Sequence, residues 1–431
     1  MEAASTLLSR WHSNTTGEIK EALCWQTAMA VDSLVELARL LPPADRMSSR
    51  IAEALNATFA LIPNRNASKP PCNKQQILDD NYDDQAWFAL AWLSYADSDL
   101  LLPAASAASV RAAAVGRAVQ IFENMARKAW DERHCGGGCW KGNLTKDDRY
   151  KNTITNVQVR RSSSLRSLSA KLLRVVLGCQ FGLLASRLAA ANATDRRVRG
   201  RSYSAWADVA LAWLDSTGLI DPTVGGLARD GLWPRSVCNA TGTWPRGQSQ
   251  APSYVASGAM LWTYNQGLLA YWLAVMGRAE RAAAMIDASL RFFAPAGRHA
   301  GILTEACDAP RQQGGGADPP YTGVDDGSSC SCNQESFKGV LVRYFMRIAR
   351  EFPAVLRRTD HGGATLTVFF SPLRLGSATL GVCTGARGAG HASLWRVIPL
   401  ARSVHGGDCQ PWVANLCGSA VDAFVTAAAT E

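Results

Sequence analysis

The sequence of 431 residues has little that predicts a β-sheet. Strict alternation of apolar and polar residues, which is typical of a half-buried strand, is almost absent before residues 366–370. No apolar run is long enough to cross a bilayer, and residues 1–10 lack the basic start and apolar core of a signal peptide. We therefore expect neither a sheet protein nor a transmembrane segment.

Interdomain linkers are also missing over most of the chain. The first stretch rich in glycine, proline and serine covers residues 309–331, and helical patterning resumes after it. Because one large helical domain can reach this length, we predict a single domain over residues 1–431.

Alanine-rich apolar runs with helical spacing recur along the chain and predict an all-α protein. Long glycine-rich loops join them, which suits a toroid of paired helices whose loops carry ligand groups at one rim. The predicted helices cover Trp25–Leu41, Ala86–Leu100, Ala107–Trp130, Ala205–Leu214, Tyr264–Met276, Ala279–Phe293 and Phe337–Ala349.

Acidic residues are fewer than basic ones, which gives a net charge of +9. The basic residues are scattered and follow no nucleic-acid-binding motif, so we do not expect a nucleic-acid partner. A mildly positive field could instead help a protein that acts near acidic or phosphorylated wall polymers.

Twelve cysteines and six Asn-X-Ser/Thr sequons together indicate the secretory pathway. We expect a secreted or cell-wall-associated glycoprotein with disulfide bonds, and we interpret the missing leader as a trimmed or mis-called N-terminus. The sequons begin at Asn14, Asn56, Asn66, Asn143, Asn192 and Asn239.

Two adjacent carboxylates, Asp83 and Asp84, precede an apolar, aromatic-rich helical segment. Cleavage of a glycosidic bond needs two carboxyl groups, one that protonates the leaving oxygen and one that attacks the anomeric carbon. Flanking Tyr82 and Trp87 offer flat faces against which a sugar can stack. The alternative is that the aspartates only cap the helix, where they accept orphan backbone N–H groups.

Neighbouring side chains on a regular helix diverge by about 100°, so both aspartates can reach one sugar only at a helix entrance. The turn-rich lead-in Asp79–Tyr82 suits that position. Two carboxyl groups so close cannot easily both ionise, so one pKa is raised and that group can serve as the acid. Close spacing is also expected of a retaining mechanism with a covalent intermediate.

Seven further blocks follow in order and, with the aspartate pair, resemble glycoside hydrolase family 76, the endo-α-1,6-mannanases and their fungal cell-wall relatives. The clear resemblance covers residues 11–347, and residues 348–431 match only weakly. The blocks are Trp130–Asp131, Cys135–Trp140, Tyr150–Asn156, Asp230–Leu232, Trp262–Gly267, Gly301–Glu305 and Phe337–Val340.

The resemblance implies an (α/α)6 barrel with its site in the central cleft. It assigns Asp83 as the nucleophile and Asp84 as the acid/base, an order that is carried over from the family. Rings and amides at the block positions suit recognition of neutral sugar hydroxyls, although each Asn or Gln could instead cap a helix. The expected substrate-binding residues are Tyr82, Trp87, Trp140, Asn156, Asp230, Tyr264, Asn265, Gln266 and Glu305.

The cysteine-flanked glycines of residues 135–139 also invite a zinc interpretation. Structural zinc needs four ligands with close cysteine pairs, and the second pair, Cys330 and Cys332, is separated by one residue only. We therefore expect disulfide or free-thiol roles, with the glycines letting the backbone approach the substrate and Trp140 forming a pocket wall. No metal or cofactor is expected, and the protein is predicted to be a monomer.

Three functions compete. The first is a secreted endo-α-1,6-mannanase that hydrolyses mannan with retention of configuration. The second is a fungal wall transglycosylase acting on the mannoprotein glycans of GPI-linked proteins; such relatives carry a C-terminal GPI signal, and residues 427–431 lack its apolar tail. The third is an inactive carbohydrate-binding barrel, against which the presence of Asp83 and Asp84 argues.

Residues 157–180 interrupt what should be a core helix between Asn156 and Phe181. The segment has five basic residues, no acidic residue and many serines. A valine codon begins with GT and a glutamine codon can end with AG, the usual limits of an intron, so we predict that the segment translates an unspliced intron. The alternative is a genuine surface excursion. Residues 244–261 are a weaker candidate for the same kind of insertion.

Overall fold

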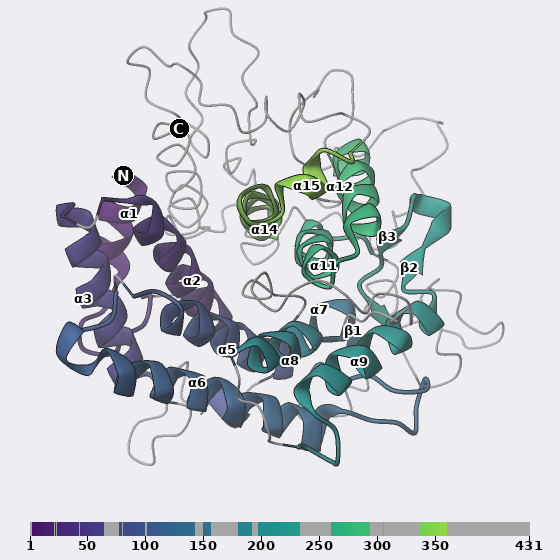
Figure 1. Cartoon of the computed structure of the whole chain (residues 1–431), viewed down its shortest axis with the longest axis horizontal. Helices are drawn as coiled ribbons and strands as arrows, with labels where there is room; N and C mark the ends of the chain where they lie inside the picture. Colours follow the sequence, from purple (N-terminus) through teal and green to yellow (C-terminus); the bar gives the residue numbers. More distant parts are fainter. Residues whose placement is uncertain are drawn as a thin grey trace, which may run out of the picture.

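The computed structural model describes residues 2–20, 22, 24–42, 44–63, 77–79, 81–99, 101–142, 150–156, 180–191, 197–232, 260–293, 305 and 337–359. Helices account for most of them and are arranged around a common centre (Figure 1). The all-α prediction is confirmed.

Long helices alternate along the chain between an inner and an outer position. The inner helices α5 and α11 are buried almost all round: in α5 every residue except Asp84 is buried, and in α11 every residue except Tyr264. The inner helices among the described residues are α2 (Cys24–Leu40), α5 (Tyr82–Ala96), α8 (Gln180–Ala190), α11 (Thr263–Val275) and α14 (Phe337–Glu351).

Each outer helix packs on the inner helix that precedes it. Outer helices bury one face only, as expected of an amphipathic helix at a protein surface. They are α3 (Arg46–Leu61), α6 (Ala107–Asn124), α9 (Tyr203–Thr217) and α12 (Ala279–Phe293), and they lie outside the inner helices in Figure 1.

Shorter elements connect these pairs. Two small antiparallel ribbons pair β1 (Lys151–Asn152) with β4 (Gly231–Leu232) and β2 (Ile220–Asp221) with β3 (Leu227–Ala228). The remaining elements are α1 (Glu2–Thr6), η1 (Leu7–Trp11), η2 (Ile77–Asp79), η3 (Ala104–Ser106), η4 (Met125–Ala129), α7 (Thr153–Asn156), η5 (Pro222–Val224) and α15 (Pro353–Leu356).

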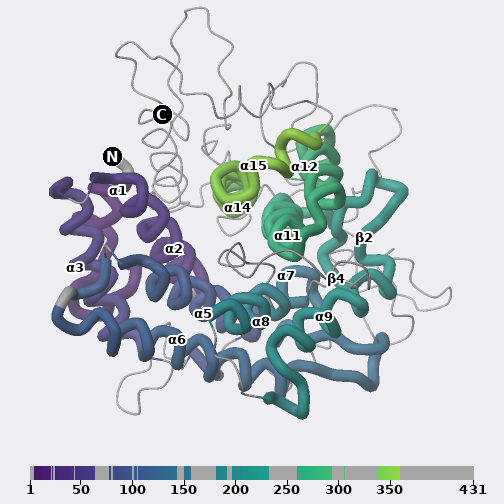
Figure 2. The backbone as a smooth tube through the Cα atoms, in the orientation of Figure 1, coloured from purple at the N-terminus to yellow at the C-terminus, as the bar shows by residue number. Residues whose placement is uncertain are grey.

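Segments far apart in the sequence close the ring. Helix α14 packs against α11 and also reaches α2, because Arg347 donates to Asp32 at 2.7 Å. Figure 2 shows the green α14 between α11 and the purple α2. The described part of the chain therefore forms a helical barrel of paired helices, the architecture that the resemblance implies.

The inner helices α2, α5, α11 and α14 begin at the same end of the barrel. Ring centroids of Trp25 and Trp87 are 6.2 Å apart, those of Trp25 and Phe337 are 6.4 Å apart, and those of Tyr264 and Phe337 are 4.2 Å apart. All four residues lie in the first two turns of their helices. We call the end marked by these four residues the mouth.

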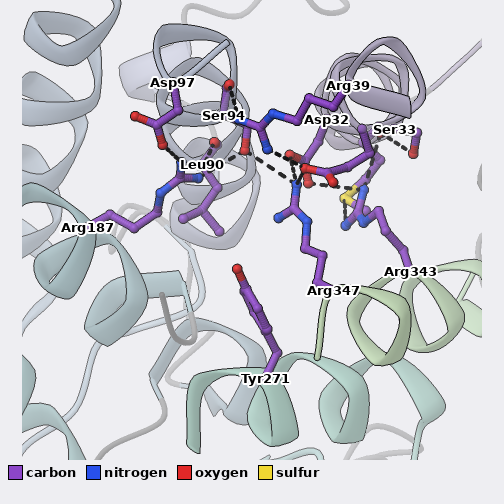
Figure 3. Close-up of polar contacts among 12 residues, drawn as sticks. Asp32, Ser33, Arg39, Leu90, Ser94, Asp97, Arg187, Tyr271, Arg343 and Arg347 are labelled. Atoms are coloured by element: carbon purple, nitrogen blue, oxygen red, sulfur yellow. Dashed lines mark hydrogen bonds and ion pairs between the residues drawn. The ribbon is translucent and has the colours of Figure 1, made fainter. Parts of the chain in front are cut away.

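The opposite end holds an ion cluster, which we call the arginine end: buried Asp32, Glu36, Arg343 and Arg347, with exposed Arg350 at its edge. Figure 3 shows Asp32, Arg343 and Arg347 of this cluster. Arg347 donates to both carboxylates at 2.7 Å. Burial acts to raise the pKa of both carboxyl groups, but the guanidinium groups outweigh it and hold both pKa values below their ordinary range. These ion pairs join the C-terminal halves of α2 and α14.

Arg187 extends the polar contacts to α8. Its guanidinium donates to the carbonyl of Leu90 at 3.1 Å, to Ser94 Oγ at 2.9 Å and to Asp97. Tyr271, near the end of α11, donates to Glu351 at 2.7 Å. Every inner helix described is therefore tied by polar contacts at this end.

The predicted helix positions agree with the observed ones to within a few residues, and α12 agrees at both ends. Helix α3 is missing from the predicted set. Its buried Met47, Ile51, Leu55 and Phe59 recur every four residues, so only one face is apolar and the segment is not rich in apolar residues overall.

Several predictions fall outside the described residues: residues 157–179, 244–259, 309–331, 366–370, and the cysteines Cys330 and Cys332. Within the described residues, no helix is both long and apolar enough to cross a membrane.

Candidate active site

Asp83 and Asp84 lie in the first turn of α5, which begins at Tyr82 and has Asn81 as its N-cap residue. The backbone N–H of Tyr82 donates to the carbonyl of Lys141 at 2.7 Å, which ties the start of α5 to the loop after Trp140. The aspartate pair therefore occupies the kind of position that the sequence predicts for two carboxyl groups serving one sugar.

Asp83 is held from both sides of its carboxyl group. Its Oδ1 accepts the backbone N–H of Asp84 at 3.0 Å, and its Oδ2 accepts from Asn152 Nδ2 at 3.0 Å. Burial raises the pKa of Asp83, and nearby Lys141 and the hydrogen bond from Asn152 only partly oppose this. Asp84 is half-buried, so the pair combines an anchored carboxyl group with one that reaches solvent.

The β1–β4 ribbon brings a third carboxyl group to the same place. Asn152, the partner of Asp83, is paired with Gly231, and Asp230 is the residue before it. A side chain at Gly231 would meet the ring of Tyr150 at 2.6 Å, so the close approach of these segments requires glycine.

Three donors surround the Asp230 carboxylate. Tyr150 Oη donates to it at 2.6 Å, Tyr264 Oη at 2.8 Å and Asn265 Nδ2 at 2.9 Å. Burial still raises its pKa above the ordinary value. Burial also raises the pKa of Tyr264, with further contributions from Asp230, Asp83 and Glu305. The structure thus gathers Asp83, Asp230, Tyr264 and Asn265 around one centre.

Two predicted ligand amides are satisfied by backbone groups instead. Gln266 donates to the carbonyls of Ala228 and Trp262 and accepts the N–H of Ala228 at 2.8 Å. Asn156 binds both backbone groups of Cys139 in the same way. Each amide pairs with both backbone groups of one residue, as a neighbouring strand would, so we call these contacts amide latches.

Glu305 also binds the protein. It accepts the backbone N–H of Thr263 at 3.2 Å and the hydroxyl of the same residue, at the start of α11. It is buried, and its contacts are those of a helix cap.

Aromatic residues line the mouth, but not all the predicted ones reach it. Tyr82 and Trp140 are buried, and Trp140 lies against the Lys151 ammonium, 4.5 Å from its ring centroid. Trp87 is buried against Trp25. Half-buried Phe337 contacts Tyr264, and Trp262 lies 5.6 Å from Phe337.

Sequence reasoning missed Trp25, Trp262 and Phe337, although Trp262 and Phe337 stand in the quoted blocks. It also missed Asn152 and Tyr150, whose block was recognised without their contacts. Their positions within the resemblance blocks were the available signal.

The glycine loop before Trp140 is organised by a buried lysine. Lys151 Nζ donates to Asp131 Oδ2 at 3.0 Å, to the carbonyl of His134 at 2.8 Å and to that of Gly137 at 2.5 Å. Gly138 has φ +93°, and a Cβ there would meet Trp213 at 2.6 Å. Cys139 is a buried free thiol whose pKa is raised by burial. Among the described residues, no group of three or more His, Cys, Asp or Glu side chains could hold a metal ion.

These features define a class of chemistry. Adjacent carboxyl groups, one anchored and one half-buried, can supply a nucleophile and a proton donor to one anomeric centre. Hydroxyl and amide donors with aromatic rings suit a neutral sugar. A helical barrel with this arrangement at the mouth of its inner helices fits a glycoside hydrolase.

Comparison with known proteins supports the glycoside hydrolase class. The sequence pattern of glycosyl hydrolase family 76 matches residues 1–165, which include the aspartate pair. This part of the chain therefore resembles the family that its motifs indicate. Among proteins of curated function, none matches the chain.

Solved structures resemble the fold. One is an inactive variant of an α-1,6-mannanase from Salegentibacter sp. HEL1_6 in complex with α-1,6-mannotriose: the identity is 16%, the TM-score is 0.51, and 100% of this chain and 99% of that chain are covered. Another is the Lin0763 protein from Listeria innocua, with 16% identity, a TM-score of 0.53, and 99% and 95% covered. At these identities the likeness establishes the barrel fold.

Proposed function

We propose that the protein is an exported endo-α-1,6-mannanase that cleaves mannan backbones with retention of configuration. The observation that carries the proposal is the position of Asp83 and Asp84 in the first turn of α5, with Asp83 anchored by Asn152. The Salegentibacter relative supports the substrate, since it was solved in complex with α-1,6-mannotriose, and its inactive form has two consecutive aspartates replaced.

In this mechanism Asp83 attacks the anomeric carbon while Asp84 gives its proton to the departing glycosidic oxygen. A covalent glycosyl ester forms on Asp83 as the bond to the leaving sugar breaks. Asp84, now ionised, takes a proton from water, which displaces Asp83 and restores the α configuration. The half-buried position of Asp84 leaves it open to both the leaving group and the incoming water.

The order of the two roles rests on the family resemblance, and the raised pKa of Asp83 makes it testable. A nucleophile must be ionised, and burial disfavours the ionised form. Lys141 and Asn152 oppose that effect and so favour the carboxylate that attack requires. In this order of roles, Asp84 must carry the proton that the leaving group needs.

The other residues at the mouth fall into two groups, those proposed to contact the sugar and those that bind other parts of the protein. Tyr264 and Phe337 are half-buried and offer rings at the mouth, and Asp230 and Asn265 lie beside them. We propose that these four contact the bound mannose units. The amide latches and Glu305 act on the protein itself and position the loops around the sugar.

The test is incubation with linear α-1,6-mannan, followed by NMR of the first-formed product. New reducing ends in the α configuration support the proposal, and early β anomer would remove the covalent mechanism. Transfer products in place of reducing ends would indicate a transglycosylase, and binding without either would indicate an inactive barrel. Activity lost with a chelator and restored by a divalent ion would mean that the carboxylates hold a metal.

Azide separates the two roles. In an Asp84→Ala variant, azide should displace the sugar from Asp83 and give the α-mannosyl azide. In an Asp83→Ala variant, azide should attack directly and give the β-mannosyl azide. The opposite pairing of variants and products would exchange the two roles.

Export is part of the proposal. Cys135 is disulfide-bonded, and disulfides persist in oxidising compartments. Detection of the native chain in culture medium or in the cell wall tests export, and retention of the chain in the cytosol contradicts it.

A further inference from the structure

Two Asn-X-Thr sequons lie in the described residues, and their surroundings differ. Asn14 belongs to a short hairpin closed by the bridge between His12 and Ile19. Asn56 lies within helix α3. A glycan is bulky and hydrated, so a folded protein can carry it only where the asparagine side chain faces water.

The Asn14 sequon is open. Asn14, Thr15 and Thr16 are all exposed at the tip of the hairpin. The amide oxygen of Asn14 faces His12 Nδ1 at 3.1 Å, so the amide nitrogen, which would carry the sugar, lies on the other side of the group. No backbone contact of the hairpin depends on that nitrogen, because the hairpin is held by main-chain bonds such as Ser13 to Glu18 at 2.9 Å.

The Asn56 sequon is closed. The amide oxygen of Asn56 accepts the hydroxyl proton of buried Tyr95, and its nitrogen donates to the carbonyl of Leu101 at 3.4 Å. The sequon threonine, Thr58, is buried and donates to the carbonyl of Gly17 at 2.8 Å. A sugar on Asn56 would break the contact between α3 and the segment around Leu101.

We propose that Asn14 is an N-glycosylation site and that Asn56 is not glycosylated in the folded protein. The proposal rests on the proposed export, because sequons are modified in the secretory pathway. The ligand class is an N-linked oligosaccharide on the outer side of the barrel. The hairpin is bonded to the start of α2, since Ile19 N–H donates to Thr27 Oγ1 at 3.2 Å, so the glycan would stand at the mouth end of the molecule.

Trypsin separates the two sequons. Cleavage after Arg10 and Lys20 gives a peptide of residues 11–20, which contains only the Asn14 sequon. Cleavage after Arg50 and Arg65 gives residues 51–65, which contain only the Asn56 sequon. Full-length chain is expressed in a eukaryotic cell with and without an added secretory leader, and the secreted, folded material is digested with and without a deglycosylating amidase.

With the leader, the 11–20 peptide should carry a glycan, which the amidase removes with conversion of Asn14 to aspartate. The 51–65 peptide should be unmodified. Asn14→Gln and Thr16→Ala should each remove the glycan, Thr16→Ser should keep it, and Asn56→Gln should leave the glycan pattern unchanged. An unmodified 11–20 peptide, or a modified 51–65 peptide in folded protein, overturns the proposal. A chain that carries the Asn14 glycan when the leader is added, but whose native form stays in the cytosol, contradicts the proposed export and leaves the site assignment standing.

Discussion

The mouth and the arginine end of the barrel both bury carboxyl groups, but with opposite effects on their acidity. Asp83 and Asp230 at the mouth have raised pKa values, whereas those of Asp32 and Glu36 at the arginine end are lowered. Burial acts to raise the pKa in all four cases. The difference lies in the partners: hydroxyl and amide donors at the mouth, guanidinium groups at the other end.

The two ends therefore respond oppositely to acid. Asp32 and Glu36 have folded-state pKa values below their unfolded ones, so their contribution to stability is present above the ordinary carboxyl pKa and is lost as the pH falls. Asp83 and Asp230 have raised values, so ionisation at higher pH disfavours the folded state. Burial among several guanidinium groups stabilises the fold, and burial mainly among hydroxyl and amide donors keeps a carboxyl group reactive.

The largest expected effect is at the mouth. Asp83→Asn and Asp84→Asn should each reduce cleavage of α-1,6-mannan by several orders of magnitude, because neither attack nor protonation has a substitute. Circular dichroism should be unchanged, and the melting temperature of Asp83→Asn at neutral pH should not fall, since a buried charge is removed. Near-native turnover in either variant would show that the catalytic assignment is wrong.

At the arginine end the expected effect is on stability. Arg347→Met leaves Asp32 and Glu36 buried without their shared partner and should lower the free energy of unfolding by about 3–5 kcal/mol. The matched control is Arg358→Met, which removes an exposed ion pair with Glu280 and should cost at most about 1 kcal/mol. Urea unfolding measures both. Equal losses would mean that burial does not distinguish the two pairs.

A smaller effect should follow from a cation that acts on both mouth carboxyl groups. Lys141 lowers the pKa of Asp83 and of Asp230, so Lys141→Gln should move the acidic limb of the kcat/KM profile to higher pH. Exposed Lys128→Gln is the control and should leave the profile in place. If the acidic limb does not move in the Lys141 variant, the ionisation that it reports is not that of Asp83.

The smallest change is expected where α7 and α8 meet. α7 contacts α8, α7 holds the mouth through Asn156, and α8 reaches the arginine end through Arg187. We propose that they are halves of one helix, so deletion of residues 157–180 should raise soluble yield and preserve helicity. A less stable or less helical product would show that the segment belongs to the fold. A transcript that retains the segment as coding sequence would exclude the intron origin.

Much of the helical architecture could be predicted because it depends on the local spacing of apolar residues. The apolar runs located most inner and outer helices, and the turn-rich residues before Asp83 placed the pair at a helix entrance, where it is found. Such signals lie within a few residues of the feature that they predict.

Contacts across the fold could not be predicted in that way. The bond between Asn152 and Asp83 joins residues 69 positions apart, and Arg347 meets Asp32 across 315 positions. The sequence shows that Gln266 can donate and accept, but only the fold shows that Ala228 takes up both functions. A polar residue at a family block position can thus either bind the sugar or stabilise the protein through internal hydrogen bonds.

The amide latches have a consequence for the thermodynamics of substrate binding. Asn156 and Gln266 each fix a loop at the mouth before any sugar arrives. The conformational entropy of those segments is lost when the protein folds. Association with the polysaccharide therefore does not include that entropic cost. Binding should then proceed with little rearrangement of the backbone at Cys139 and Ala228, and mutations in the latches should weaken affinity through entropy more than through lost contacts with the glycan.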